Sequence, residues 1–337
     1  MRKATVLLVL LLAALPLAAA GGLQIYFIDV EGGQATLIVS PSGQSMLVDA
    51  GWPSKWGPGA DRILAAAKMA GITQIDYMLV THYHLDHVGG VPELAARIPI
   101  VTYVDHGPNT ETDMMAHALE TAYNQVVAKA KRLVVKPGDR IPLAGVNVEV
   151  VTAAGAAISS PLRGAGQPNG ACDGVKPIEA DPTENGRSIG FILSYGRFRF
   201  ADFGDLTWIR ELPLVCPANL LGTVDVFLVS HHGIAISNSP ALVEALHPKA
   251  AVMNNGLRKG GAPQAWTAVR DSPGLEDLWQ LHYSLAGGAK HNSPETYIAN
   301  PETGGGCQGY WLTLAASADG AFTITNSRNG FTKAYPK

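Results

Sequence analysis

Short apolar runs rich in β-branched residues alternate along this chain with longer segments of helical character. The runs bounded by turn residues are typical of strands, at residues 23–29, 34–39, 45–48, 75–80, 99–104, 132–135, 146–152, 189–195, 197–201, 224–229, 250–253, 310–316 and 321–326. Helices are predicted at residues 61–70, 91–97, 111–130 and 240–246. Hairpins mixed with strand–helix units, in two similar halves, predict an α/β fold with mixed sheets in a four-layer sandwich. The Gly- and Pro-rich stretch 154–187 is predicted to be a long loop.

The first residues form a pattern typical of a secretory signal. Two basic residues precede an apolar run at 4–15, and small residues follow at Ala18–Ala20. The apolar run is shorter than the roughly 20 residues that span a membrane. We therefore expect residues 1–20 to be a cleaved signal peptide and residues 21–337 to be a single domain, which is exported to the periplasm or secreted without a stable membrane anchor. An uncleaved anchor is the alternative.

Composition narrows the choice of partner. The net charge of −3 is too small to favour binding to nucleic acid or to an anionic membrane surface. A nucleic-acid substrate is therefore possible, but the charge of the chain gives no support for it. Three cysteines, Cys172, Cys216 and Cys307, allow one disulfide and one free thiol in an exported protein. The sequence does not decide which two of them pair.

One short segment carries metal-binding chemistry. His82, His84, Asp86 and His87 directly follow the apolar strand at 75–80. A loop at the end of a strand can turn several side chains toward one point, so we expect this segment to be a loop. Imidazole and carboxylate ligands together suit zinc, with manganese or iron as alternatives. The pattern His-x-His-x-Asp-His therefore predicts a metal site at the end of this strand.

The same segment resembles the metal-binding signature of the metallo-β-lactamase superfamily. This resemblance implies the αββα sandwich of that superfamily, with mixed sheets and two bound metals, most simply zinc. It also implies that His82 and His84 hold the first metal, and that Asp86 and His87 hold the second.

Further residues follow in the order of the superfamily, and the resemblance covers roughly residues 23–256. Asp205 matches the aspartate that bridges the two metals. His231, at the end of the strand 224–229, matches the last ligand of the second metal. Asp49, in Leu-Val-Asp-Ala-Gly, resembles the acidic residue that supports the site from behind.

Within the superfamily, the chain is most similar to the competence-type (DNA-uptake) metallohydrolase group. The similarity lies in residues 27–30, 184–188, 203–206 and 231–233. Members of this group are thought to be nucleases, and exported phosphorylcholine esterases share part of the pattern. The resemblance therefore implies a small-molecule or phosphodiester substrate.

One departure from the wider superfamily concerns the first metal. Many members have a third histidine for this metal, but no histidine lies between His117 and His231. The competence-type group has Asn and Ser at this place, as this chain does at Asn185 and Ser188. Both are therefore candidate contacts of the first metal or of the substrate.

The remaining histidines divide into two sets. His106, which ends a strand, is either a contact of the site or a structural residue, and His232 is interpreted as a residue near the metals that donates a proton. The others are interpreted as surface or core histidines: His117, His247, His282 and His291. Arg258 and Lys259 are interpreted as part of a solvated loop, with contact to an anionic substrate as the alternative.

These residues predict an exported hydrolase that uses a metal-bound hydroxide, most simply on phosphoester or phosphodiester bonds. Two divalent ions would lower the pKa of a bound water toward about 7 and polarise the substrate. Asp86 or Asp205 would take up a proton, and His232 would donate one to the leaving group. The alternatives are a β-lactam or lactone hydrolase, an iron-dependent redox or sulfur enzyme, and a metal-dependent binding protein without catalysis.

Overall fold

The computed structural model describes residues 22–173, 175, 181–304 and 306–337. The predicted signal peptide, residues 1–20, lies outside the described residues. Within the described part of the chain, no helix is long and apolar enough to cross a membrane.

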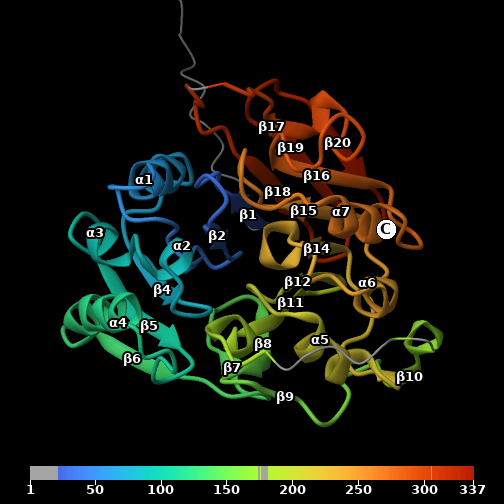
Figure 1. Ribbon diagram of the computed structural model, residues 1–337, viewed down its shortest axis with the longest axis horizontal. Coiled ribbons are helices and arrows are strands. Elements are labelled where there is room, and N and C mark those ends of the chain that lie inside the picture. The colour runs from blue at the N-terminus through green and yellow to red at the C-terminus, as the bar shows by residue number, and fades with distance from the viewer. Residues whose placement is uncertain (1–21, 174, 176–180, 305) are drawn as a thin grey trace, which may run out of the picture.

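The first of two large sheets has nine strands and takes them from both ends of the chain (Figure 1). In spatial order the strands are β20 (Thr332–Tyr335), β19 (Phe322–Asn326), β18 (Leu312–Ala316), β1 (Leu23–Phe27), β2 (Thr36–Val39), β3 (Ser45–Val48), β4 (Ile75–Leu79), β5 (Ile100–Asp105) and β6 (Lys131–Val134). Neighbours pair antiparallel from β20 to β3 and parallel from β3 to β6. The C-terminal strands thus complete the sheet that the N-terminal strands begin.

The second sheet also has nine strands and is built from the later part of the chain. In spatial order they are β17 (Ile298–Asn300), β16 (Asp277–His282), β15 (Ala250–Met253), β14 (Val226–Leu228), β12 (Phe198–Asp202), β11 (Gly190–Tyr195), β8 (Asn147–Ala153) and β7 (Arg140–Ile141), with β9 (Ala156–Ala157) also on β8. Strands β12 to β17 run parallel. A separate short pair joins β10 (Gln167–Pro168) to β13 (Ala218–Asn219).

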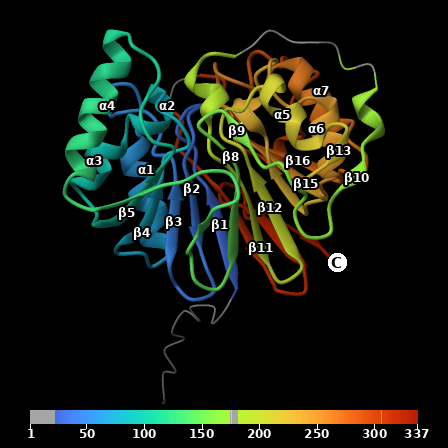
Figure 2. The same ribbon diagram turned by 90° about the horizontal axis from the view of Figure 1, so that it is seen from below.

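Helices cover the outer face of each sheet, which confirms the predicted four layers (Figure 2). The first sheet carries α1 (Gly59–Met69), α3 (Val91–Ala95) and α4 (Met114–Val127), and the second carries α5 (Trp208–Val215), α6 (Pro240–Leu246) and α7 (Pro263–Arg270). One short helix, α2 (Leu85–Val88), follows β4. Single 3-10 turns are η1 (Gly170–Cys172), η2 (Glu184–Arg187), η3 (Ser230–Gly233) and η4 (Glu295–Tyr297).

Aromatic and branched side chains fill the space between the two sheets. Phe27 of β1 and Phe200 of β12 pack with ring centroids 5.9 Å apart, and Phe191 of β11 lies 6.2 Å from Phe200. Burying each such ring contributes about 2–3 kcal/mol. This core holds the sheets face to face, so the loops that follow β4, β12 and β14 meet at one edge of the sandwich.

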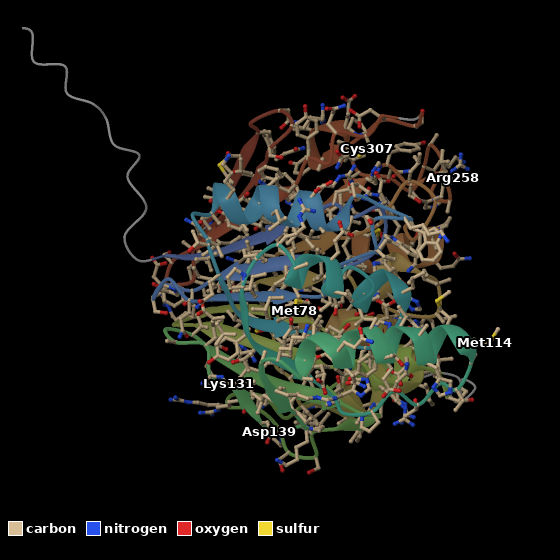
Figure 3. All side chains as sticks on the ribbon, turned by 90° about the vertical axis from the view of Figure 1, so that its left-hand side faces the viewer. Met78, Met114, Lys131, Asp139, Arg258 and Cys307 are labelled. Carbon is tan, nitrogen blue, oxygen red and sulfur yellow. A yellow bond between two sulfur atoms is a disulfide. The ribbon has the colours of Figure 1, made fainter. Side chains whose placement is uncertain are left out.

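Helix α4 is shorter than the pattern predicts. It begins at Met114 because the Asp113 side chain accepts hydrogen bonds from the backbone N–H groups of Met115, at 2.7 Å, and Ala116, at 3.0 Å. Met114 is 90% exposed and projects from the molecule (Figure 3). Residues 111–113 were predicted to be helical, but they precede the helix, and Asp113 is its N-cap.

Several elements were absent from the sequence prediction: α2, α5, α7, β7, β9, β10, β13, β16, β17 and β20. Helix α5 carries Pro213 within it, which is unusual inside a helix. Strand β16 buries the polar side chains of Gln280 and His282, so its pattern is not that of an apolar strand. The four two-residue strands are too short to leave a pattern.

The cysteine arrangement answers the question that the sequence left open. A disulfide joins Cys172 to Cys216, and Cys307 keeps a free thiol. The bond ties Cys172, at the end of η1, to the residue that follows α5, and the described part of the predicted loop 154–187 contains the short elements β9, β10, η1 and η2. Asn169 strengthens this attachment, because its Nδ2 donates to the backbone oxygens of Val215, at 3.1 Å, and Ala241, at 3.0 Å.

Candidate metal centre

The candidate ligands come from loops at the ends of three strands. The histidine-rich segment follows β4, Asp205 follows β12, and His231 and His232 follow β14. The prediction that the whole histidine-rich segment is a loop was wrong in its second half. The backbone N–H groups of His87 and Val88 both donate to His84 O at 3.0 Å, which closes the single helical turn of α2. This turn places Asp86 and His87 on the side that faces the second sheet.

Four buried side chains converge most closely: Asp86, His87, Asp205 and His232. The Nε2 of His87 lies 3.3 Å from Asp86 Oδ2 and 3.2 Å from Asp205 Oδ2. His232 Nε2 lies 3.2 Å from His87 Nε2 and 3.2 Å from Asp86 Oδ2. Two imidazole nitrogens and two carboxylates facing one point form a ligand set that suits a divalent transition metal.

A second group of imidazoles also lies near Asp205, and its His82 ring has its centroid 4.1 Å from that of His87. His82 Nε2 is 3.0 Å from His84 Nδ1 and 3.9 Å from Asp205 Oδ2. His231 Nε2 lies 3.4 Å from the same carboxylate oxygen. The same Asp205 oxygen therefore faces imidazoles of both groups, as expected of a carboxylate that is shared by two metals.

The protonation of these groups suits metal binding. Burial holds the pKa of His82 well below its ordinary value, and the charge of His87 lowers it further. Burial opposes ionisation of Asp86, but His87 and His232 hold the pKa of that carboxyl well below its usual range. The pKa of Asp205 is lowered in the same way, against burial, by neighbouring histidines. A neutral imidazole such as His82 is the form that binds a metal. Burial lowers the pKa of His87, but Asp205, Asp86 and Asp49 raise it well above its ordinary value, so metal binding would release the proton of this ring.

Asp49 holds the ring of His87 from behind. Its Oδ2 lies 2.7 Å from His87 Nδ1 and accepts from Thr81 Oγ1 at 2.6 Å, while its Oδ1 accepts from the Thr81 N–H at 2.8 Å. The carboxylate is fully buried. Because Asp49 accepts a hydrogen bond from the Nδ1–H group of His87, the Nε2 atom of the neutral ring is left without a proton and can bind the metal.

The model of the metallo-beta-lactamase superfamily matches residues 28–253 of this sequence. The chain belongs to the metallo-β-lactamase superfamily. The predicted fold class is thereby confirmed. The residues of the centre fit the metals of that superfamily, since Asp205 Oδ1 is buried and accepts no hydrogen bond among the described residues.

Individual relatives are more distant. The hydroxyacylglutathione hydrolase of Aliivibrio salmonicida is 46% identical over 55 residues, which are 16% of this chain and 21% of that protein. The match thus spans about a fifth of that relative. The metallo-β-lactamase fold protein YhfI from Bacillus subtilis is 10% identical, with 77% of this chain and 96% of that chain covered and a TM-score of 0.46. A putative metal-dependent hydrolase from Parabacteroides distasonis is 18% identical, with 77% and 92% covered and a TM-score of 0.43.

In this member of the metallo-β-lactamase superfamily, His232 and not His231 lies with Asp86 and His87. The superfamily resemblance implied His231 as the ligand, and His232 was expected near the metals as a proton donor. Strand β14 has already ended, and both histidines adopt left-handed backbone conformations, with φ of 55° and 54°. Such a turn lets both rings face Asp205. The structure thus differs from the assignment of His231 to the second metal.

Hydrogen bonds from α5 and the following loop hold this left-handed turn. Asn238 Oδ1 accepts from the Ser230 N–H at 2.9 Å. The carboxylate of Glu211 in turn accepts from the N–H groups of Asn238, at 2.6 Å, and Ser239, at 2.7 Å. Burial raises the pKa of Glu211 to about 7. These contacts fix the backbone just before His231 and its neighbour.

The other residues that the sequence predicts as contacts of the site differ in what they touch. Ser188 Oγ is 3.4 Å from His82 Nδ1 and accepts from the Asp205 N–H at 3.2 Å, so it sits behind both residues. Asn185 Oδ1 is buried and has no hydrogen-bond partner among the described residues, which leaves it free to contact a metal or substrate. His106 instead faces a carboxylate, with its Nε2 2.9 Å from Glu184 Oε2.

Sequence reasoning missed three charged residues around the centre. Lys259 Nζ contacts Asp86 Oδ2, so the interpretation of this lysine as part of a solvated loop was wrong. Glu111 Oε1 lies 3.1 Å from His84 Nε2. Glu184 binds His106 and accepts from the Thr110 N–H at 2.9 Å. The only available signal for Lys259 was its place after the strand end at 254–256, which is typical of residues that line this edge.

Proposed function

We propose that this chain is an exported hydrolase of the competence-type group that cleaves phosphoester or phosphodiester bonds with two zinc ions. The observation that carries the proposal is Lys259. Its ammonium group contacts Asp86 and lies 5.3 Å from the centre of the Trp52 ring, so a positive charge is held beside the candidate metal centre. A fixed cation there favours an anionic substrate over a neutral one.

Two sets of residues would hold the metals. The first set is His82, His84 and Asp205, and the second is Asp86, His87, His232 and the shared Asp205. When bound, two divalent ions supply an activated water and polarise the substrate oxygen. Zinc suits the nitrogen and oxygen ligands best, and manganese or iron are the alternatives. Asn185 is the candidate to complete the first set, because its Oδ1 is buried and has no hydrogen-bond partner among the described residues.

The protein's own side chains would supply proton transfer and substrate orientation. Asp86 and Asp205 are the carboxylates that would take up a proton, and Lys259 would orient an anionic group of the substrate. His232 was assigned as the proton donor to the leaving group, but its Nε2 lies among the ligand atoms of the second set. His231, which is slightly more exposed, is therefore the second candidate for this role.

The first experiment compares the metal content and hydrolysis of the wild type and of Asp86→Ala. We expect about two metals in the candidate metal centre and cleavage of bis-p-nitrophenyl phosphate that the substitution abolishes. Cleavage of nitrocefin or of an acylglutathione, without phosphodiesterase activity, would replace the proposal with a β-lactam or ester hydrolase. The match to the hydroxyacylglutathione hydrolase, over 55 residues, is the reason to include the acylglutathione.

Lys259→Met should weaken the binding of an anionic substrate. We expect the KM for bis-p-nitrophenyl phosphate to rise about tenfold, equivalent to about 1.4 kcal/mol, because a positive charge beside the candidate metal centre is lost. The KM for the neutral ester p-nitrophenyl acetate should stay unchanged. Steady-state kinetics on both substrates, at constant ionic strength, make the measurement.

Arg258→Met is the matched control, since Arg258 is the neighbouring cation and is exposed (Figure 3). It should leave both KM values near those of the wild type. Equal losses on the anionic and the neutral substrate in Lys259→Met would show that Lys259 stabilises the fold of the site and does not select a charge.

A further inference from the structure

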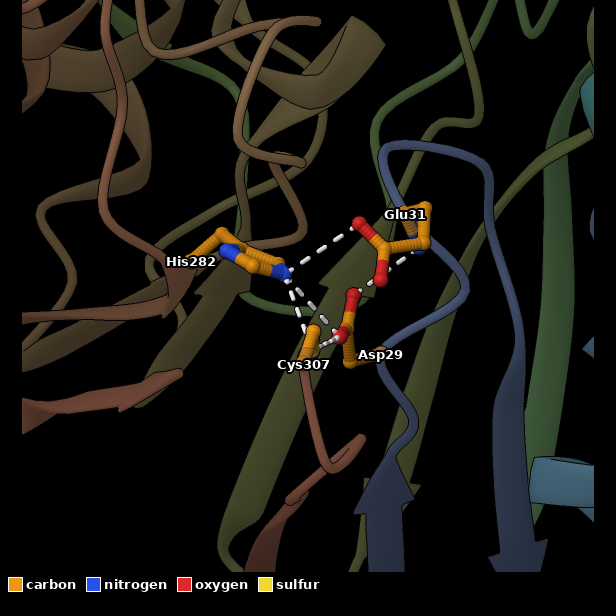
Figure 4. A group of neighbouring side chains, drawn as sticks. All are labelled: Asp29, Glu31, His282 and Cys307. Carbon is orange, nitrogen blue, oxygen red and sulfur yellow. Dashed lines mark hydrogen bonds and ion pairs between the residues drawn. The ribbon is translucent and has the colours of Figure 1, made fainter. Parts of the chain in front are cut away.

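A second cluster of potential ligands lies outside the candidate metal centre (Figure 4). Asp29 and Glu31 come from the turn after β1, His282 ends β16, and Cys307 belongs to the segment before β18. Asp29 and His282 are buried, and Glu31 and Cys307 are partly exposed. The cluster therefore joins the start of the chain to its C-terminal part.

The ligand atoms of this cluster all lie within 4.8 Å of one another, and four of their separations are short. His282 Nε2 lies 3.2 Å from Asp29 Oδ2, 3.3 Å from Glu31 Oε2 and 3.3 Å from Cys307 Sγ. Cys307 Sγ lies 3.2 Å from Asp29 Oδ2. A tetrahedral zinc with bonds of about 2.0 Å to nitrogen and oxygen and about 2.3 Å to sulfur has edges of about 3.3 Å and 3.5 Å. The observed separations are close to these edges.

We propose that Asp29, Glu31, His282 and Cys307 form a separate, mononuclear zinc site. Hydrogen bonding alone explains the cluster poorly, because Nε2 of His282 carries at most one proton and faces three acceptors. The thiol adds only a weak donor. One ion at the centre would satisfy all four groups at once.

The charges around the cluster balance when the ion is present. Binding releases the thiol proton of Cys307 to solvent, and His282 binds through Nε2 as neutral imidazole. The thiolate and two carboxylates then carry three negative charges, which Zn²⁺ and Arg62 offset. Arg62 is placed for this, with Nη1 2.8 Å from Asp29 Oδ2 and Nη2 3.1 Å from Glu31 Oε1. Its position as an outer partner of both carboxylates is typical of residues that orient metal ligands.

The site would have a structural role. Four protein ligands leave no open position for a substrate, as in structural zinc sites. The turn that supplies Asp29 and Glu31 continues to Gln34, whose N–H donates to Asp86 O at 3.2 Å. A Cβ added to Gly33 would lie 2.4 Å from that same oxygen, so the turn packs directly against the backbone of Asp86. The zinc would therefore brace the turn on which the candidate metal centre rests.

Cobalt substitution tests the site without relying on activity. A thiolate bound to Co²⁺ gives a charge-transfer band in the near ultraviolet, whereas histidine and carboxylate ligands do not. Of the three cysteines in the sequence, Cys172 and Cys216 form the disulfide, so Cys307 is the only thiol that can produce this band. The full mature protein would be loaded with Co²⁺ without reductant, as wild type, Cys307→Ser and Asp86→Ala.

We expect the charge-transfer band in the wild type and in Asp86→Ala. Cys307→Ser should lose the band, and it should bind one equivalent of metal fewer than the wild type. Zinc should also protect the thiol from a disulfide-exchange reagent in the wild type. No band, with a thiol that reacts equally fast with and without metal, would overturn the site and leave a metal-free hydrogen-bond network. Should Cys307→Ser fail to fold, Glu31→Gln serves instead, with weaker cobalt binding as the expected result and unchanged binding as the contrary one. Because Asp86→Ala removes hydrolysis but not the band, failure of this site and failure of the proposed function are distinguishable.

Discussion

Replacing Asp205 with alanine is expected to reduce hydrolysis of bis-p-nitrophenyl phosphate by about a thousandfold or more, equivalent to about 4 kcal/mol of transition-state stabilisation. The Oδ2 of this carboxylate lies 3.2 Å from His87 Nε2 and 3.4 Å from His231 Nε2, and His82 Nε2 is 3.9 Å away. Its removal takes away the carboxylate that faces imidazoles of both proposed ligand sets. Turnover and metal content per chain, measured on the same samples, should fall together.

Asp225→Ala is the control for this substitution. Asp225 is also a buried carboxylate next to β14, but it precedes the strand, accepts from the Arg199 N–H at 2.8 Å and pairs with Lys337. We expect Asp225→Ala to keep its metals and its turnover. Asp205→Asn, which preserves the shape of the side chain, should behave like Asp205→Ala. Retention of both metals and activity in the two Asp205 variants would refute the assignment of a shared ligand.

The parts of the fold and site that the sequence predicted are those encoded over short distances. Residues 82–87 carry four candidate ligands in one run after a strand, and the strand 250–253 and the helix 240–246 have the predicted bounds. Asp205 could be assigned because it follows a strand in a recognisable local motif. In each case the pattern of neighbouring residues is enough to indicate the structure.

The parts that the sequence did not predict depend on contacts between distant segments. The orientation of His231 and His232 depends on a left-handed turn, which Asn238 and Glu211 hold by hydrogen bonds to the backbone. Lys259 contacts a residue 173 positions earlier in the chain. No local pattern carries that information, because such a contact exists only after the two sheets have packed.

The same reason explains why the cluster around Cys307 was missed. His282 was interpreted as a surface or core histidine, and Cys307 only as a leftover thiol. Cys307 Sγ meets Asp29 Oδ2 across 278 positions of the chain, through the pairing of β18 with β1. Spacing rules for zinc ligands apply to ligands on neighbouring turns, and these four residues are spread over almost the whole chain.

Asp49→Asn is expected to weaken metal binding by about 10–100-fold, the usual cost of losing a partner behind a metal ligand. The amide has nearly the shape of the carboxylate, so the backbone contact of Oδ1 with Thr81 can persist. The Nδ2 group, however, would donate to His87 Nδ1, where the carboxylate accepts. The proton of the ring would then move to Nε2, which faces Asp86 and Asp205. A ring nitrogen that carries a proton cannot bind a metal.

Competition with a chromogenic chelator would measure the affinity of wild type, Asp49→Asn and Asp76→Asn. Asp76 is the matched control, because its Oδ2 accepts from the N–H of Ser45 at 2.8 Å on the same sheet and no candidate ligand. If Asp49 acts through the tautomer of His87, raising the zinc concentration should restore turnover in Asp49→Asn, because the metal ligands themselves remain. Wild-type affinity in Asp49→Asn would mean that the ring of His87 is held by the helical turn of α2 alone. Loss of turnover that excess zinc does not restore would instead give Asp49 a part in the reaction beyond orienting His87.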